Sequence, residues 1–154
     1  MIAVALTAIA LATASPDRAR CEALVALDGP PCEDRIATCE RVGAIAREMG
    51  VSVALVTALA YHEARYDPEP PRMCSTLQVS PRTWCPWCSH RECERVGVRV
   101  LGLLLEQERA RGPGCYQRRA LRRWLRGPHG WRGIDERGER WIGAVLRTAA
   151  GEDR

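Results

Sequence analysis

The residue of this sequence best placed to do chemistry is Glu63, a carboxylate on the apolar face of an expected helix. Leu55, Leu59 and Glu63 are spaced i, i+4 and i+8, so they share one helical face. Pro68 disfavours helical geometry before it and predicts that the helix ends just after Tyr66, with Glu63 in the last turn. Partial desolvation there raises a carboxyl pKa, as a general acid requires. The alternative is a surface glutamate at a helix end.

Three short pieces of the sequence stand in an order that is typical of one enzyme family. They are Glu63, Tyr66 and Pro68 at the helix end, Gln78, Pro81 and Thr83 within LQVSPRTW, and ALRRWLRGP at Ala120–Pro128. These pieces resemble the motifs E-S-x-F-x-P, G-L-M-Q-x-x-P-x-T and A-L-x-A-Y-N-x-G-P. The motifs belong to the soluble lytic transglycosylases and goose-type lysozymes, and the resemblance spans about residues 43–146.

This resemblance implies a mainly α, lysozyme-like single domain that cleaves the β-1,4 bond between N-acetylmuramic acid and N-acetylglucosamine in peptidoglycan. It implies that Glu63 protonates the glycosidic oxygen and then acts as the base, with no metal or organic cofactor. The substrate-binding residues that it implies are Ser75, Leu77 and Gln78 in the loop, Tyr66, and Trp124 in the slot of the family's Tyr. A Trp at that position is also a natural floor for a sugar ring, with a core aromatic as the alternative.

The sequence departs from the family pattern around the glutamate. Ala64 replaces a Ser, Ser75–Leu77 stand where the family has Gly, Leu and Met, and Trp124 with Leu125 replaces Tyr-Asn. The acid is kept while the substrate-binding residues are altered, so two hypotheses stay open. One is a divergent lytic transglycosylase. The other is a secreted, cysteine-rich, lysozyme-like protein that binds glycan or a cell-envelope assembly without cleaving it.

The reaction product depends on whether a second carboxylate assists Glu63. A muramidase-type hydrolase activates a water with such a group, whereas the transglycosylases use the C6 hydroxyl of muramic acid and need one Glu. The acids that could assist are Asp67, Glu69, Asp135 and Glu136, and none stands in a motif. We therefore expect 1,6-anhydromuramic ends on the released fragments.

The first 14 residues have the pattern of an export signal. Ile2–Leu11 is apolar and too short to span a bilayer, and Ala12–Ala14 fits the small-x-small cleavage pattern. An uncleaved lipid-facing anchor is the alternative. The remaining residues, 15–154, have the length of one domain. We expect a secreted or periplasmic monomer that acts on peptidoglycan glycan strands.

Eight cysteines agree with export, because an even count in a small secreted chain indicates disulfides. Four bridges would be the maximum, and the sequence does not give their pairing. A zinc site is the competing interpretation, with Cys85, Cys88, His90 and Cys93 as ligands of the right type at short spacing. No second C-x-x-C pair supplies the other half of a standard site, so we expect disulfides and no metal.

The positive charge is concentrated in one segment. All 23 basic residues are Arg, the net charge is +4, and Arg109–Arg132 contains eight Arg and no acid. Such a segment could hold an anionic glycan, a nucleic acid or a phospholipid surface, or it is a solvated helix face. We expect no nucleic-acid partner. Strong salt dependence without glycan preference would indicate one.

Apolar periodicity predicts helices throughout and few or no strands. The expected helices are Asp17–Leu27, Glu33–Met49, a helix capped by Ser52, Arg91–Glu108, Tyr116–Arg126 and about Glu136–Ala149. In Arg91–Glu108 the apolar face carries Val96, Val100, Leu103 and Leu104. Residues 67–90 form an irregular, proline-rich segment that we expect cystines to order.

Overall fold

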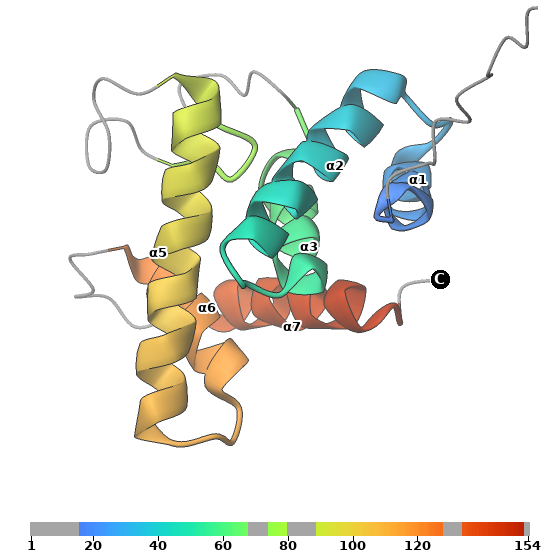
Figure 1. Cartoon of the computed structure of the whole chain (residues 1–154). Helices are drawn as coiled ribbons and strands as arrows, with labels where there is room; N and C mark the ends of the chain where they lie inside the picture. The colour runs from blue at the N-terminus through green and yellow to red at the C-terminus, as the bar shows by residue number, and fades with distance from the viewer. Residues whose placement is uncertain (1–15, 68–73, 80–88, 128–133, 153–154) are drawn as a thin grey trace, which may run out of the picture.

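The regular structure consists of helices in the residues that the computed structural model describes, which are 16–67, 74–79, 89–127 and 134–152. The first half holds α1 (Arg18–Val25), the 3-10 turn η1 (Ala26–Asp28), α2 (Glu33–Glu48) and α3 (Val53–Ala64) (Figure 1). The second half holds α5 (His90–Arg111), α6 (Tyr116–Arg126) and α7 (Glu136–Ala150). No strand occurs in these ranges, so the predicted mainly α class is confirmed for one small domain.

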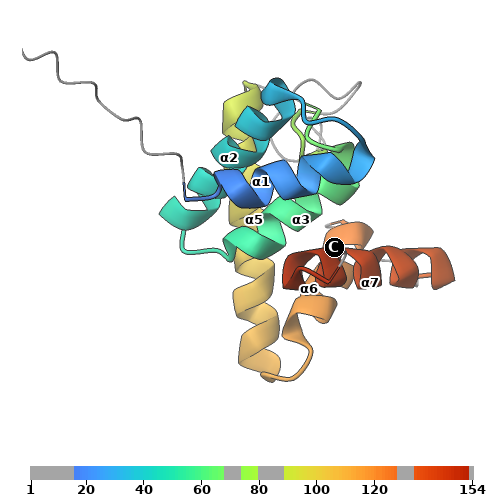
Figure 2. The ribbon, with the colours of Figure 1, turned by 90° about the vertical axis from the view of Figure 1, so that its right-hand side faces the viewer.

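α3 lies at the centre of the fold, and its burial explains why. Every residue from Leu55 to Tyr61 is at most 5% exposed. A helix buried on all sides needs partners around it, and α1, α2 and α7 supply them (Figures 1 and 2). Ser52 caps the helix as predicted, because its hydroxyl accepts from the Leu55 amide at 3.3 Å. The helix that carries the candidate acid is therefore held by three other helices.

α5 and α6 pack against each other beside this core, and α7 runs from α6 across the end of the bundle (Figure 1). The prediction of the α5 apolar face is wrong in part. Val98 and Leu101 are buried, whereas Leu103 is 50% exposed. The buried face also contains Glu94 and Glu108, at 1% and 2% exposure. Apolar periodicity cannot recognise a face that buries acids.

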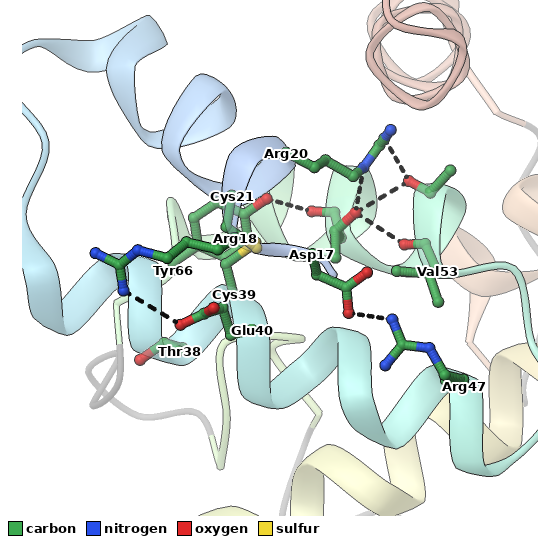
Figure 3. The surroundings of a disulfide bond; sticks show 12 residues. Asp17, Arg18, Arg20, Cys21, Thr38, Cys39, Glu40, Arg47, Val53 and Tyr66 are labelled. Carbon is green, nitrogen blue, oxygen red and sulfur yellow. Dashed lines mark hydrogen bonds and ion pairs between the residues drawn. A yellow bond between two sulfur atoms is a disulfide. The ribbon is translucent and has the colours of Figure 1, made fainter. Parts of the chain in front are cut away.

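Two disulfides join elements that are distant in the sequence. Cys21–Cys39 links α1 to α2 (Figure 3), and Cys74–Cys93 links the short segment 74–79 to the first turn of α5. The predicted disulfide framework is confirmed for these four residues. The remaining cysteines are Cys32 and Cys115, which are exposed free thiols, and Cys85 and Cys88, which lie outside the described residues. The maximum of four bridges is therefore not reached.

Polar contacts fix α1 to the core beside the Cys21–Cys39 bridge (Figure 3). The Arg20 guanidinium donates to Thr57 Oγ1 at 3.1 Å and to the Ala54 carbonyl at 3.2 Å, both on α3. Asp17, which is 7% exposed, pairs with Arg47 of α2 at 2.5 Å. The bridge and these contacts hold α1 against both α2 and α3.

The predicted export signal, residues 1–14, lies outside the described part of the chain. Within the described part, no helix combines the length and the apolar composition that crossing a bilayer requires.

Candidate active site

α3 ends at Ala64, two residues earlier than the position of Pro68 predicts. Arg65 and Tyr66 both adopt left-handed backbone conformations, with φ of 52° and 58°. This turn buries the Tyr66 ring completely, and the Tyr66 hydroxyl donates to the Thr57 carbonyl at 2.8 Å. The burial of the ring explains why the helix cannot continue, and it makes the candidate acid the penultimate residue of α3.

The turn after α3 is held from α2. Arg35 donates through Nε to the Arg65 carbonyl at 2.6 Å and through its terminal nitrogen to Asp28 at 2.9 Å. The Tyr61 hydroxyl also donates to Asp28, at 3.0 Å, and the Arg65 guanidinium lies 4.2 Å from the centre of the Tyr61 ring. Left-handed conformations are unfavourable for residues with a side chain, so these contacts stabilise a turn that would otherwise relax.

Glu63 is half-buried at this helix end. Its Oε1 accepts a hydrogen bond from the Trp124 indole N–H of α6 at 2.9 Å. No basic side chain of the described residues forms an ion pair with this carboxyl. Burial disfavours the charged form and raises the pKa of Glu63 above its ordinary value of 4.5, while the Trp124 hydrogen bond opposes part of the rise. The shift has the direction that a general acid requires.

Gln78 approaches the same helix end from segment 74–79. Its side-chain amide donates to the main-chain carbonyl of Glu63, and its backbone is left-handed, with φ of 50°. Four non-glycine residues of the described chain have positive φ, and Arg65, Tyr66 and Gln78 are three of them. Unfavourable backbone conformations concentrate where function demands a fixed geometry, so their position around one carboxyl supports a site.

Segment 74–79 is packed tightly beneath Gln78. Leu77 and Val79 lie against Gly97 of α5, where an added Cβ would come within 2.9 Å of both side chains. The Ser75 hydroxyl accepts from the Leu77 amide at 3.2 Å. The Thr76 hydroxyl, also buried, has no hydrogen-bond partner, alone among the buried side-chain polar atoms of the described residues. The segment is thus tightly packed even though the buried Thr76 hydroxyl lacks a hydrogen bond, which lowers the stability of the fold.

The structure brings three of the six residues predicted for the site into direct contact: Glu63, Gln78 and Trp124. The other three, Tyr66, Ser75 and Leu77, are at most 1% exposed, so their side chains are not accessible to a ligand in this structure. They support the site from beneath. Their main-chain atoms are covered as well, so their role in binding substrate stays a prediction.

The acids considered as a second carboxylate are mostly engaged elsewhere. Asp135 caps α7 by accepting from the Gly138 amide at 2.8 Å. Glu136, in the first turn of α7, is exposed, and its carboxylate lies 3.6 Å from the Arg140 guanidinium one turn further along the helix. Asp67 is exposed just beyond α3, and Glu69 lies outside the described residues. None of the acids in the described ranges is among the groups that shift the pKa of Glu63.

Five of the eight Arg in the arginine-rich segment are paired with two acids. Glu108, buried on α5, accepts from Arg119 at 3.0 Å and from Arg111 and Arg123 at 2.8 and 3.3 Å. Glu139 of α7 pairs with two further Arg of α6, Arg118 and Arg122, at 2.8 and 2.6 Å. The four of these Arg that lie on α6 fasten it to α5 and α7, which reduces the field that they offer to an anionic polymer.

The residues considered as zinc ligands do not form a site in the described part of the chain. Cys93 is bonded to Cys74, and a disulfide sulfur does not serve as a thiolate ligand. Cys85, Cys88 and the side chain of His90 lie outside the description. Within it, no group of three or more His, Cys, Asp or Glu side chains is arranged to hold a metal ion.

Comparison with known proteins gives no relative for this chain: no family model, no curated protein and no solved structure matches it.

Proposed function

We propose that the protein is a peptidoglycan lytic transglycosylase of lysozyme-like fold, with Glu63 as its general acid and base. The observation that carries this proposal is the Glu63 carboxyl, which is half-buried, has no basic partner among the described residues and has a raised pKa. Carboxyls whose pKa is shifted by burial are concentrated in active sites. The contact of Gln78 and Trp124 with Glu63 adds support, because all three come from the segments that resemble the family motifs.

In the proposed reaction, Glu63 gives its proton to the oxygen that bridges muramic acid C1 and the next sugar. The C1–O bond breaks and its electron pair stays on that oxygen. The C6 hydroxyl oxygen of the same muramic acid bonds to C1, and its proton returns to the Glu63 carboxylate. Water is not consumed, and the masses of the two products add up to the mass of the starting strand. One carboxyl group serves both steps.

The surroundings of Glu63 favour this route over hydrolysis. A hydrolase usually directs its water with a second carboxylate on the other side of the bond. Asp135 and Glu136 instead serve the first turn of α7. The muramidase-type hydrolase is therefore the second choice of reaction.

The proposed substrate, a cell-wall glycan, places the protein in the periplasm or outside the cell. Disulfides persist in such oxidising compartments and are rare in the cytosol, so Cys21–Cys39 and Cys74–Cys93 agree with this location. The predicted export signal would deliver the chain there.

The second hypothesis is a lysozyme-like protein that binds glycan, or docks on a cell-envelope assembly, without cleaving it. The buried Ser75–Leu77 segment and Trp124 favour it, because they change the residues around the acid relative to the family pattern. An altered site could retain a glycan without placing the scissile bond against Glu63.

Digestion of purified peptidoglycan, with mass spectrometry of the soluble products, tests the proposal. The expected result is released muropeptides with 1,6-anhydromuramic ends, which are lighter by one water than reducing ends. Reducing ends that incorporate label from heavy-oxygen water would show a muramidase. Retention of the protein on the insoluble wall without release of fragments would favour the binding hypothesis.

A further inference from the structure

The Trp124 indole contacts Glu63 through an atom of fixed chemical character. An indole N–H can donate a hydrogen bond and cannot accept one. It points at Oε1 of Glu63, at a nitrogen–oxygen distance of 2.9 Å. Oε1 must therefore act as the acceptor of this bond whether the carboxyl is charged or neutral.

The neutral form of the carboxyl has one hydroxyl oxygen and one carbonyl oxygen. A carbonyl oxygen is a stronger acceptor than a carboxyl hydroxyl oxygen, so the indole N–H favours Oε1 as the carbonyl oxygen and Oε2 as the oxygen that carries the proton. A Tyr hydroxyl, which the resembling family has in this slot, can both donate and accept, so it would leave either oxygen free to carry the proton. The Trp in this chain can only donate, so it shifts that choice toward Oε2.

The main chain at Glu63 is held as well. The Gln78 amide bonds to the Glu63 carbonyl, and the turn at Arg65 is fixed by Arg35. The backbone and one carboxyl oxygen thus have defined partners, from segment 74–79, α2 and α6. The other oxygen has no partner among the described residues.

We propose that Trp124 is a positioning residue, which holds Oε1 of Glu63 as an acceptor so that Oε2 is the oxygen that carries and delivers the proton. The delivery to a glycosidic oxygen rests on the proposed function. The placement of the proton on Oε2 does not, because it follows from the indole contact alone. This assignment differs from the sugar platform that the sequence suggests for Trp124.

A hydrogen bond to the charged form of an acid favours that form, so the indole also limits how far burial raises the Glu63 pKa. Trp124→Phe keeps an aromatic ring and removes the N–H. In this variant the pKa of Glu63 should rise further above its ordinary value. Trp141→Phe is the matched control, because Trp141 is also half-buried, on α7, and does not supply the hydrogen bond to Glu63.

The test is an NMR titration of the substrate-free protein that follows the Glu63 carboxyl carbon and the Trp124 indole N–H. The two signals should move with one common pKa in the wild type, and the indole signal should lose this step in Glu63→Gln. Trp124→Phe should raise the Glu63 pKa, and Trp141→Phe should leave it unchanged. An indole signal that ignores the Glu63 titration would overturn the proposal, and so would an unchanged pKa in Trp124→Phe.

Kinetics on peptidoglycan separate a positioning residue from a sugar platform. Trp124→Phe should lower kcat on the order of tenfold with little change in KM, because the acid is less well oriented. A raised KM with unchanged kcat would make Trp124 a substrate contact and contradict the proposal. A wild type without lytic activity would instead count against the proposed function, while the titration would still decide the role of Trp124. If the Phe variant does not fold, the titration of the wild-type indole N–H signal still tests whether Trp124 senses the charge of Glu63.

Discussion

The carboxyl groups of Glu63 and Glu108 are both shielded from water, yet their hydrogen-bond partners differ and their pKa values shift in opposite directions. Glu108, on α5, is surrounded by the guanidinium groups of three Arg. Burial alone would raise the pKa of Glu108, but the Arg119 hydrogen bond and the charges of Arg111 and Arg123 outweigh it and lower the pKa. Among the described residues the Glu63 carboxyl has only an indole N–H as its partner, and its pKa is raised.

Glu94, at the other end of α5, follows the pattern of Glu108. Its side chain is 1% exposed and receives two hydrogen bonds from Arg41 of α2, at 2.8 and 2.9 Å. A chain with 23 basic residues, all of them Arg, has no shortage of partners for a buried acid. That no described Arg pairs with Glu63 is thus a local property of that site. The buried acids of α5 are paired with Arg. Glu63, the acid proposed for catalysis, has no such pair among the described residues, so burial can raise its pKa.

Removing either of the two disulfides should give the largest losses of stability. One bridge lies away from the site and the other holds it, so the two variants separate effects on the scaffold from effects on the site. Cys21–Cys39 and Cys74–Cys93 close segments with sequence separations of 18 and 19, so each should stabilise the fold by about 3 kcal/mol through the unfolded chain. We expect similar losses in urea unfolding when either pair is changed to Ala. Lytic activity at low temperature should fall only for the Cys74–Cys93 pair, because that bridge holds the segment with Gln78. Equal losses of activity in both variants would remove the distinction between scaffold and site.

The buried ion pair between Arg41 and Glu94 should give the next largest effect. Arg41→Met leaves Glu94 buried without its cation, and we expect a loss of about 2–3 kcal/mol in urea unfolding, reduced by the partial exposure of Arg41. Arg95→Met is the control, because Arg95 and Glu48 form an exposed pair whose loss should not be measurable. If Arg41→Met is as stable as the control, burial of Glu94 does not require neutralisation.

A smaller effect is expected from Gly97, which allows segment 74–79 to pack on α5. Gly97→Ala places a Cβ 2.9 Å from Leu77 and Val79 and should destabilise the fold by about 1–2 kcal/mol. Activity should fall as well, because Gln78 directly follows Leu77. Gly114→Ala is the control, since a Cβ there meets nothing within 4 Å. Wild-type activity in Gly97→Ala would show that the segment does not position Gln78.

The helices could be predicted from the sequence because apolar periodicity and local caps are short-range properties. Glu63 could be found by its spacing from Leu55 and Leu59 on an otherwise apolar face. The end of α3 could not be placed, because Tyr66 turns back to bury its ring, a tertiary preference that overrides the helix signal. The buried face of α5 was missed for a related reason, since its two acids look like solvent-facing residues until their Arg partners are known.

The role of Trp124 illustrates the same limit. The sequence places an aromatic residue in a slot of the family motif, which suggests a sugar platform. Only the structure brings its N–H against Glu63, 61 positions away in the chain. Arg35 likewise fixes the turn at Arg65 from 30 positions away, and no sequence pattern marks it.

The smallest expected effect is the opposite pH dependence that the two carboxyls give to stability. The folded protein holds the Glu63 proton more tightly than the unfolded chain, so this contribution is present below pH 4.5 and is lost as pH rises through the folded pKa. The Glu108 contribution is present above pH 4.5 and is lost as pH falls through its lowered pKa. Thermal unfolding of Glu63→Gln across this range should show less decline in Tm with rising pH than the wild type. An identical slope would mean that Glu63 titrates normally.

The rate at which Glu63→Gln releases soluble muropeptides from purified peptidoglycan tests the central claim most directly. This variant keeps the shape of the side chain and an acceptor for Trp124, and it removes the proton donor. We expect a loss of at least roughly a hundredfold relative to the wild type, with an unchanged far-UV spectrum. Glu106→Gln, on the exposed side of α5, should retain the wild-type rate. A Glu63→Gln protein that releases fragments as fast as the wild type would show that this carboxyl is not the catalyst.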